Sequence, residues 1–187
     1  MTAKQELRAS LRARRKQLAL DHPEAAQDLA RYASALPSGQ VVALYQAIGS
    51  EMKTAPLAQA LIEQGRTLCL PVVNERDAPV IFRLWSPGDP LEEDEAGCPA
   101  PLPLAATIQP DLILCPLLAF DAMGQRLGQG GGYYDRTFAA LPEVIRIGLA
   151  YAGQEVGQLE TEPHDIGLDG VLTETGYRAL HETGILR

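Results

Sequence analysis

The sequence predicts an α/β fold in which helices cover both faces of a mostly parallel sheet. Short apolar runs that indicate buried strands alternate with segments whose apolar residues recur at helical spacing, and this alternation is typical of such folds. A glycine-rich turn follows one apolar run and precedes a helical segment, as phosphate-binding turns of α/β proteins do. The length of 187 residues suits one domain, so we expect residues 1–187 to form a single unit.

The elements of the first half are indicated by apolar spacing and by the prolines and glycines at their ends. We expect a helix at 3–19, a second helix at 23–36 that Pro37 ends, and a third helix that Thr54 caps and Gly65 ends. Strands are expected at 41–45, 67–73 and 80–85, followed by a long proline-rich loop at 86–110.

The second half continues the same alternation. We expect a buried strand and its exit at 111–120, the glycine turn, a helix at 134–141, a buried strand at 144–151 and a short final strand at 170–172. A loop with His164 and Asp165 precedes the final strand. Ligands of parallel sheets bind beyond the carboxyl ends of the strands, so the glycine turn and this loop are both expected at that edge.

Composition and charge exclude several classes of protein. The first 16 residues carry a net charge of +5 and the remainder −13, which gives −8 for the chain, and an acidic body argues against a nucleic-acid partner. The longest apolar run, 112–120, is broken by Pro116 and is far shorter than a membrane span of ~20 residues. The charged N-terminus does not read as a signal peptide. Three cysteines without a CxxC pair indicate the cytoplasm, with Cys69 and Cys115 in the core.

The glycine turn carries the clearest chemical signal. Four glycines fall within 128–132, where they permit positive φ and let backbone amides approach a ligand. The start of the next helix adds unpaired N–H donors and partial positive charge, so we predict a phosphate-binding site. Arg126 and Arg136 flank it, and Asp135 is placed to hold Mg²⁺. The pattern is neither a Walker A loop nor a dinucleotide fingerprint.

These residues resemble the signature of a known family. The segment Arg126-Leu-Gly-x-Gly-Gly-Gly-Tyr-Tyr-Asp-Arg136, preceded by Pro116-Leu-Leu-Ala-Phe-Asp-x-x-Gly124, is similar to that of the 5-formyltetrahydrofolate cyclo-ligase (methenyltetrahydrofolate synthetase) family. Weaker matches follow in the family's order at Lys4 and Arg8, Glu51 and Thr54, Trp85 to Asp89, Gly148 to Tyr151 with Gln154, His164-Asp165, and Thr173-Glu174. The resemblance implies a three-layer α/β/α domain, as in ribose-5-phosphate isomerase and the CoA transferases.

The resemblance also implies an activity. Family members use ATP and Mg²⁺ to convert 5-formyltetrahydrofolate, with or without a polyglutamate tail, to 5,10-methenyltetrahydrofolate, and they release ADP and phosphate. The formyl oxygen attacks the γ-phosphate, N10 of the substrate closes the ring, and phosphate departs. Both the nucleophile and the leaving group belong to the substrates, so the protein has to position them and neutralise charge. We expect a monomer with no nucleic-acid or membrane partner.

The family's roles carry over to matching positions. The implied ATP-binding residues are Lys4, Arg8, Arg126, Leu127, Gly128, Gln129, Gly130, Gly131, Gly132, Tyr133 and Tyr134. The implied substrate-binding residues are Gln46, Glu51, Gln129, Gly130, Gly131, Gly132 and Tyr133, and the reaction is expected at Arg126, Gln129 and Tyr133. Asp135 and Asp165 match the Mg²⁺ positions, and His164 is expected to orient its loop. The alternatives are a solvated helix face for Lys4 and Arg8, a turn for Asp165, and core packing rather than folate contact for Tyr45 and Trp85.

Two departures and two rival functions remain. Gln129 and Gly131 stand where some family members carry Arg or Lys, and the segment 97–101 lacks the glutamate of a Gly-Ile-x-Glu-Pro element. The first rival is an ATP-dependent ligase or kinase of the same fold with another small substrate. The second is a non-catalytic folate- or nucleotide-binding module, which the intact phosphate and metal residues disfavour. The change Asp135→Asn is expected to abolish turnover with little loss of fold.

Overall fold

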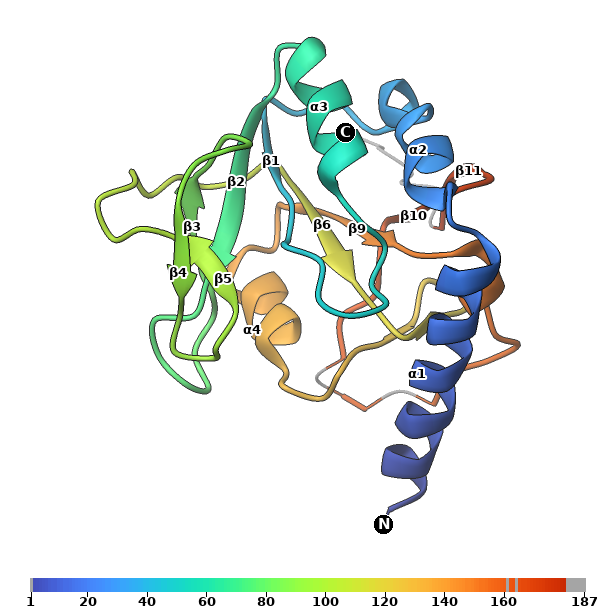
Figure 1. The fold of residues 1–187 in the computed structure, drawn as a ribbon. Helices are drawn as coiled ribbons and strands as arrows, with labels where there is room; N and C mark the ends of the chain where they lie inside the picture. Colours follow the sequence, from blue (N-terminus) through green and yellow to red (C-terminus); the bar gives the residue numbers. More distant parts are fainter. Residues whose placement is uncertain (1, 161, 164, 181–187) are drawn as a thin grey trace, which may run out of the picture.

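A seven-stranded sheet forms the centre of the computed structural model, which describes residues 2–160, 162–163 and 165–180 (Figure 1). Its strand order is β11-β10-β9-β6-β1-β2-β3. These strands are β1 (Val41–Ala43), β2 (Thr67–Val72), β3 (Ile81–Leu84), β6 (Leu112–Pro116), β9 (Ile145–Leu149), β10 (Gly170–Thr173) and β11 (Gly176–Ala179). The inner strands are parallel and the two edge strands are antiparallel, so the predicted mostly parallel sheet is confirmed.

Helices cover the two faces of this sheet, which confirms the three-layer α/β/α prediction. One face packs against α2 (Ala25–Ala30), the short 3₁₀ turn η1 (Ala33–Ala35), α3 (Ala55–Glu63) and the end of α1 (Ala3–Asp21), and the other against α4 (Tyr133–Ala140) (Figure 1). Alternate residues of each strand face opposite layers. In β6, for example, Leu112 and Leu114 face the first layer, whereas Ile113 and Cys115 face the second.

The central strands are buried on both sides, as their apolar runs predict. The residues 112–115 of β6 are at most 1% exposed. Cys69 and Cys115 are fully buried in their strands, which confirms their predicted place in the core. None of the described helices combines the length and the apolar character that a membrane crossing needs.

The predicted long loop at 86–110 is wrong, because it contains a hairpin of β4 (Leu91–Glu93) and β5 (Pro99–Pro101). The carboxylate of Asp94 organises its turn by accepting hydrogen bonds from the backbone N–H groups of Ala96, Cys98 and Val73. The sequence did not predict this hairpin because its strands are surrounded by prolines. A two-stranded edge pairing tolerates prolines, which lack an N–H, whereas the interior of a sheet does not.

The predicted helix at 23–36 is also wrong in extent. The helix α1 continues to Asp21, α2 covers only Ala25–Ala30, and the chain then tightens into the 3₁₀ turn η1. The N–H of Ala35 donates to the carbonyl of Tyr32, three residues back, which is the hydrogen bond of a 3₁₀ turn. This turn brings Ala33 and Leu36 into the same buried cluster as α2.

Three smaller differences concern the start of α3, the residues that follow β6, and the last strand. Thr54 occupies the predicted N-cap position of α3, but its side chain makes no capping hydrogen bond: the hydroxyl donates to the carbonyl of Tyr45 at 2.9 Å and so ties the exit of β1 to the helix. The predicted strand at 111–120 breaks after Pro116, and its end forms β7 (Ala119–Phe120), which pairs with β8 (Arg126–Leu127). The edge strand β11 was not predicted, because its residues are mixed rather than apolar.

Candidate functional site

The glycine loop, residues 128–132, joins β8 to the start of α4. Gly130 and Gly132 have φ angles of 105° and 68°, which ordinary residues rarely adopt. A Cβ on Gly130 would lie 3.3 Å from Arg8 Cζ, and one on Gly132 would lie 2.7 Å from Arg136 Nη1. Among the described residues, no backbone N–H of the glycine loop donates to a protein acceptor. The loop therefore presents a row of free amide donors.

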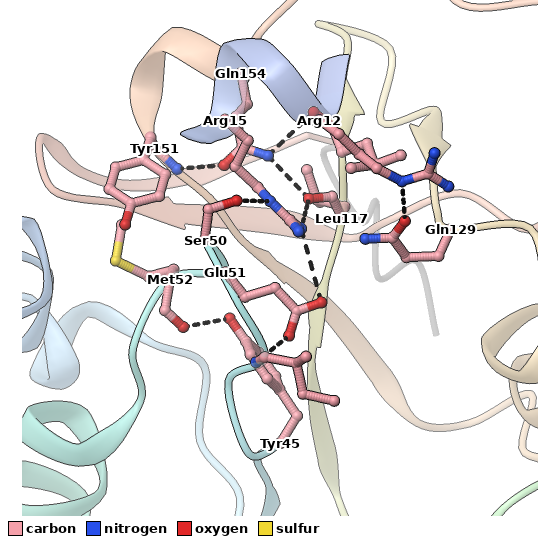
Figure 2. Close-up of polar contacts among 12 residues, drawn as sticks. Arg12, Arg15, Tyr45, Ser50, Glu51, Met52, Leu117, Gln129, Tyr151 and Gln154 are labelled. Carbon is pink, nitrogen blue, oxygen red and sulfur yellow. Dashed lines mark hydrogen bonds and ion pairs between the residues drawn. The ribbon is translucent and has the colours of Figure 1, made fainter. Parts of the chain in front are cut away.

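Basic side chains of α1 reach this loop and its surroundings. Arg8 Nε donates to the carbonyl of Gly128 at 3.1 Å. Arg12 Nε donates to Gln129 Oε1 at 2.8 Å, a contact drawn in Figure 2. Lys4 Nζ donates to Glu162 Oε1 at 2.7 Å. The basic stripe of α1 is thus packed against the loop segments rather than forming a merely solvated helix face.

Arg126 and Asp135 form a tight pair behind the loop. Arg126 Nη2 lies 2.6 Å from Asp135 Oδ1, and the Arg126 side chain is only 6% exposed. Its guanidinium lies over the ring of Phe138, 5.1 Å from the centroid. The N–H of Ile166 also donates to Asp135 Oδ1, at 3.3 Å. Within the described part of the chain, Asp135 Oδ2 has no donor, so one carboxylate oxygen is open to a cation.

The segment around Asp165 lies against Asp135. Asp165 Oδ2 accepts a hydrogen bond from the N–H of Glu162 at 2.7 Å, and the adjacent Ile166 supplies the contact with Asp135. His164, which was expected to orient this loop, lies outside the described residues. No group of three or more His, Cys, Asp or Glu side chains that could hold a metal occurs among the described residues. Two carboxylates suit Mg²⁺ nonetheless, because this ion usually keeps water and phosphate oxygens among its ligands.

Residues of the glycine loop line two clefts. The first, which we call the α1 cleft, has a volume of about 880 Å³ and is lined by residues that include Arg12, Arg15, Glu51, Cys98, Gln129 and Tyr151. The second, which we call the α4 cleft, has a volume of about 640 Å³ and is lined by residues that include Gly130, Gly131, Gly132, Asp135, Arg136 and Ile166. Both volumes suit small-molecule sites. The loop can therefore contact a ligand in each cleft, through Gln129 in the first and through Gly130, Gly131 and Gly132 in the second.

Glu51 places a carboxylate in the wall of the α1 cleft, and Figure 2 shows this carboxylate directed toward Arg15. Its Oε2 accepts a hydrogen bond from the N–H of Ile48 at 3.0 Å, and its Oε1 lies 3.7 Å from Arg15 Nη1. Burial raises the pKa of Glu51, and the Ile48 N–H and the Arg15 charge oppose this shift. Burial likewise lowers the pKa of Arg15. The result is a shielded acceptor that faces a ligand-sized space.

The other expected folate contacts lie elsewhere. Tyr45 is buried in the core and its hydroxyl donates to the carbonyl of Met52 at 2.7 Å. Trp85 is buried in the same cluster. Gln46 lines a separate cleft of about 380 Å³ together with Trp85 and Lys53, so the structure does not bring Gln46 and Glu51 into one cleft. Among the described residues, Trp85 Nε1 has no hydrogen-bond partner.

Sequence reasoning missed two arginines of the site. Arg12 and Arg15 contact Gln129 and Glu51, although only Lys4 and Arg8 were assigned to the ligand. Their spacing of three and four residues on α1 was the available signal, but a periodic stripe does not reveal which segment it packs against. Gln154 was matched to the family without a role; its side chain holds the exit of β6 by donating to the carbonyls of Leu117 and Leu118.

The sequence model of the 5-formyltetrahydrofolate cyclo-ligase family matches residues 1–174. The chain belongs to this family. A cyclo-ligase of Haemophilus influenzae is 33% identical over 180 residues, which cover 90% of this chain and 96% of the relative. A cyclo-ligase of Mycolicibacterium smegmatis is 35% identical over 147 residues, which cover 73% of this chain and 74% of the relative.

A solved structure places the fold in the cyclo-ligase family as well. The solution structure of the 5,10-methenyltetrahydrofolate synthetase of Aquifex aeolicus matches with a TM-score of 0.80 and 28% identity. The match covers 100% of this chain and 97% of that protein. The whole cyclo-ligase architecture, and not only the glycine loop, is therefore shared.

Proposed function

We propose that the chain closes the ring of 5-formyltetrahydrofolate to give 5,10-methenyltetrahydrofolate, with ATP as phosphoryl donor and Mg²⁺ as its counterion. Membership of the cyclo-ligase family supports the reaction class. The observation that carries the proposal is the glycine loop between two clefts, since its amide groups are free to bind an anion.

The nucleotide is assigned to the α4 cleft and the glycine loop. Backbone amides at the start of a helix bind phosphate by direct hydrogen bonds and by the partial positive charge of the helix. Arg136 lines the same cleft and adds a cation there. Its guanidinium is placed beside the loop, 4.9 Å from the centroid of the Tyr133 ring, and donates a hydrogen bond to the carbonyl of Gly131. Lys4 and Arg8 complete the proposed phosphate contacts together with Arg126, Leu127, Gln129 and Tyr134.

The folate is assigned to the α1 cleft. The carboxylate of Glu51 suits the N–H donors of a pterin, because a carboxylate accepts strong hydrogen bonds when it is ionised. Lys16, Lys53 and His22 line the same cleft and suit the carboxylates of a polyglutamate tail. Gln46 lines a separate cleft, so we propose it only as an additional contact for a part of the folate that extends beyond the α1 cleft.

The reaction is assigned to residues 129–133, which include the loop residues that line the two clefts. The formyl oxygen attacks the γ-phosphate and ADP leaves, which gives an iminium carbon that bears phosphate. N10 then attacks that carbon, and inorganic phosphate leaves with the N10 proton. Arg126 and the loop amides stabilise the negative charge, while Gln129 and Tyr133 position the reacting groups. Asp135 and Asp165 would hold Mg²⁺, which neutralises phosphate charge when bound.

Free cysteines at 69, 98 and 115 fit a reducing compartment, so we place this activity in the cytoplasm, carried out by a monomer. The test is an absorbance assay with purified protein, ATP and 5-formyltetrahydrofolate, run with and without Mg²⁺. We expect methenyl absorbance to grow only when both ATP and Mg²⁺ are present. Nucleotide binding without that absorbance would favour a related ligase or kinase, and folate binding without ATP consumption would favour a non-catalytic module.

A further inference from the structure

We propose that Arg15 is a positioning residue of the α1 cleft. Arg15 holds the Glu51 carboxylate in place and joins it to the chain segment that leads into the glycine loop. The inference rests on the proposed function, since it assigns a role in binding folate. Arg15 does not itself have to touch the substrate: it acts through Glu51.

Arg15 connects three segments that are distant in the sequence (Figure 2). Its Nε donates to Ser50 Oγ at 3.2 Å, and its Nη1 donates to the carbonyl of Leu117 at 3.1 Å and lies 3.7 Å from Glu51 Oε1. The Arg15 side chain is only 6% exposed. A guanidinium offers its donors in a fixed planar fork, so a single side chain can fix the two segments relative to α1.

The contact with Leu117 extends this bracing to the phosphate side. Leu117 follows β6, and its carbonyl also accepts a hydrogen bond from Gln154 Nε2 at 2.9 Å. The next residue, Leu118, donates its N–H to the carbonyl of Leu127 at 2.7 Å, directly before Gly128. The position of Glu51 is therefore linked through Arg15 to the residues that lead into the glycine loop.

Arg15 is also the cation that opposes the burial of Glu51. Burial raises the pKa of Glu51 and the Arg15 charge lowers it. The other titratable groups that interact with Glu51 are Tyr45 after β1, Tyr134 on α4 and Cys98 in the β4–β5 hairpin, which are neutral at pH 7. Lys16 and Lys53 line the same cleft, but within the described residues neither forms an ion pair with Glu51. Without Arg15, a larger share of Glu51 is protonated at a given pH.

The experiment compares Arg15→Met and Arg15→Lys with the unchanged protein. For Arg15→Met we expect KM for 5-formyltetrahydrofolate to rise about tenfold, which is the effect of losing one charged hydrogen bond, while KM for ATP changes less than about twofold. The acid limb of the pH profile of kcat/KM for folate should move to higher pH. Arg15→Lys should restore this limb in part but not KM, because an ammonium does not reproduce the fork.

Arg14→Met is the matched control, because Arg14 is an exposed neighbour on the same helix, and it should behave as the unchanged protein. Thermal unfolding of every variant separates loss of fold from loss of positioning. If Arg15→Met leaves the folate KM and the acid limb unchanged, Arg15 only braces the structure. If the methionine variant does not fold, the same comparison is made with Arg15→Lys.

The two proposals fail in different ways. If the unchanged protein makes no methenyl product, the proposed function fails, and fluorescence titration with 5-formyltetrahydrofolate then tests Arg15 by binding alone. A dissociation constant about tenfold higher in Arg15→Lys or Arg15→Met supports the role of Arg15. Equal dissociation constants, or no folate binding by the unchanged protein, overturn it.

Discussion

At the residue scale, Asp135 divides its carboxylate between two tasks. Its Oδ1 accepts hydrogen bonds from the guanidinium of Arg126 and the N–H of Ile166, whereas Oδ2 accepts none from the described residues and is assigned to the proposed cation. We expect Asp135→Asn to lower kcat by about 100-fold or more, because the amide no longer binds Mg²⁺. The variant should also lose about 1–3 kcal/mol of stability, because the buried Arg126 loses its counterion. Loss of this ion pair thus lowers the stability of the variant, whereas the sequence alone predicted little loss of fold.

Steady-state kinetics against Mg²⁺ concentration and urea unfolding measure the two effects separately. Asp28→Asn is the control, because Asp28 makes only an exposed ion pair with Arg31 on the surface. Wild-type turnover of Asp135→Asn at ordinary Mg²⁺ would remove Asp135 from the metal site.

The three thiols differ in their surroundings, and this difference is open to a direct chemical test. Burial raises the pKa of Cys69 to about 12 and that of Cys115 to about 11, and both side chains are fully buried. Cys98 is partly exposed in the wall of the α1 cleft. At pH 8 we expect a thiol reagent to label one cysteine per native chain and three per denatured chain, because reaction needs an accessible thiolate.

Bound folate should slow the labelling of Cys98, whereas ATP should leave the rate largely unchanged, because only the folate is assigned to that cleft. Mass spectrometry of the labelled peptides identifies the site. Fast native labelling of Cys69 or Cys115 would contradict the burial of their strands.

At the scale of elements, the glycine loop depends on its backbone shape. We expect Gly130→Ala to raise KM for ATP about tenfold, because a φ of 105° is strained for alanine by about 1–3 kcal/mol and relaxation would displace the amide groups. The added methyl would also press on Arg8. Gly157→Ala is the matched control, since a Cβ there meets open space.

Nucleotide titrations and steady-state kinetics of both variants provide the measurement. Equal ATP affinity in Gly130→Ala and the unchanged protein would mean that the loop does not hold the nucleotide in the shape seen here.

Strands that carry an apolar run were predicted, and these include the edge strand β3, which lies within the predicted range 80–85. The inner parallel strands, such as β6 and β9, were predicted because burial on both faces leaves an uninterrupted apolar run. The hairpin of β4 and β5 and the edge strand β11 were missed, because strands with an open side keep prolines and polar residues.

The candidate site also has parts that the sequence predicted and parts that it did not. The glycine loop and Asp135 are contiguous in the sequence, so their pattern was sufficient to predict a phosphate site. The contact of Arg15 with Glu51 joins residues from separate elements, and no local pattern specifies such a tertiary contact.

At the scale of the whole molecule, two separate clefts lined by residues of one loop lead us to expect that two ligands bind together. We expect a non-hydrolysable ATP analogue with Mg²⁺ and 5-formyltetrahydrofolate each to raise the unfolding temperature, and their stabilising effects to add. Each ligand at 100 times its Kd contributes about 2.7 kcal/mol if it binds only the folded state.

Differential scanning calorimetry with each ligand alone and with both checks this expectation. Loss of one ligand's effect in the presence of the other would mean that the two compete for one cleft.

The contacts of α1 have a consequence for biosynthesis. Lys4 meets Glu162 across 158 positions of the chain, and Arg8 meets Gly128 across 120. On the ribosome, the amino-terminal helix emerges long before the segments against which it rests, and such distant pairings form late. A nascent polypeptide therefore holds no complete pocket until translation is nearly finished. Neither nucleotide nor folate can therefore assist its early folding.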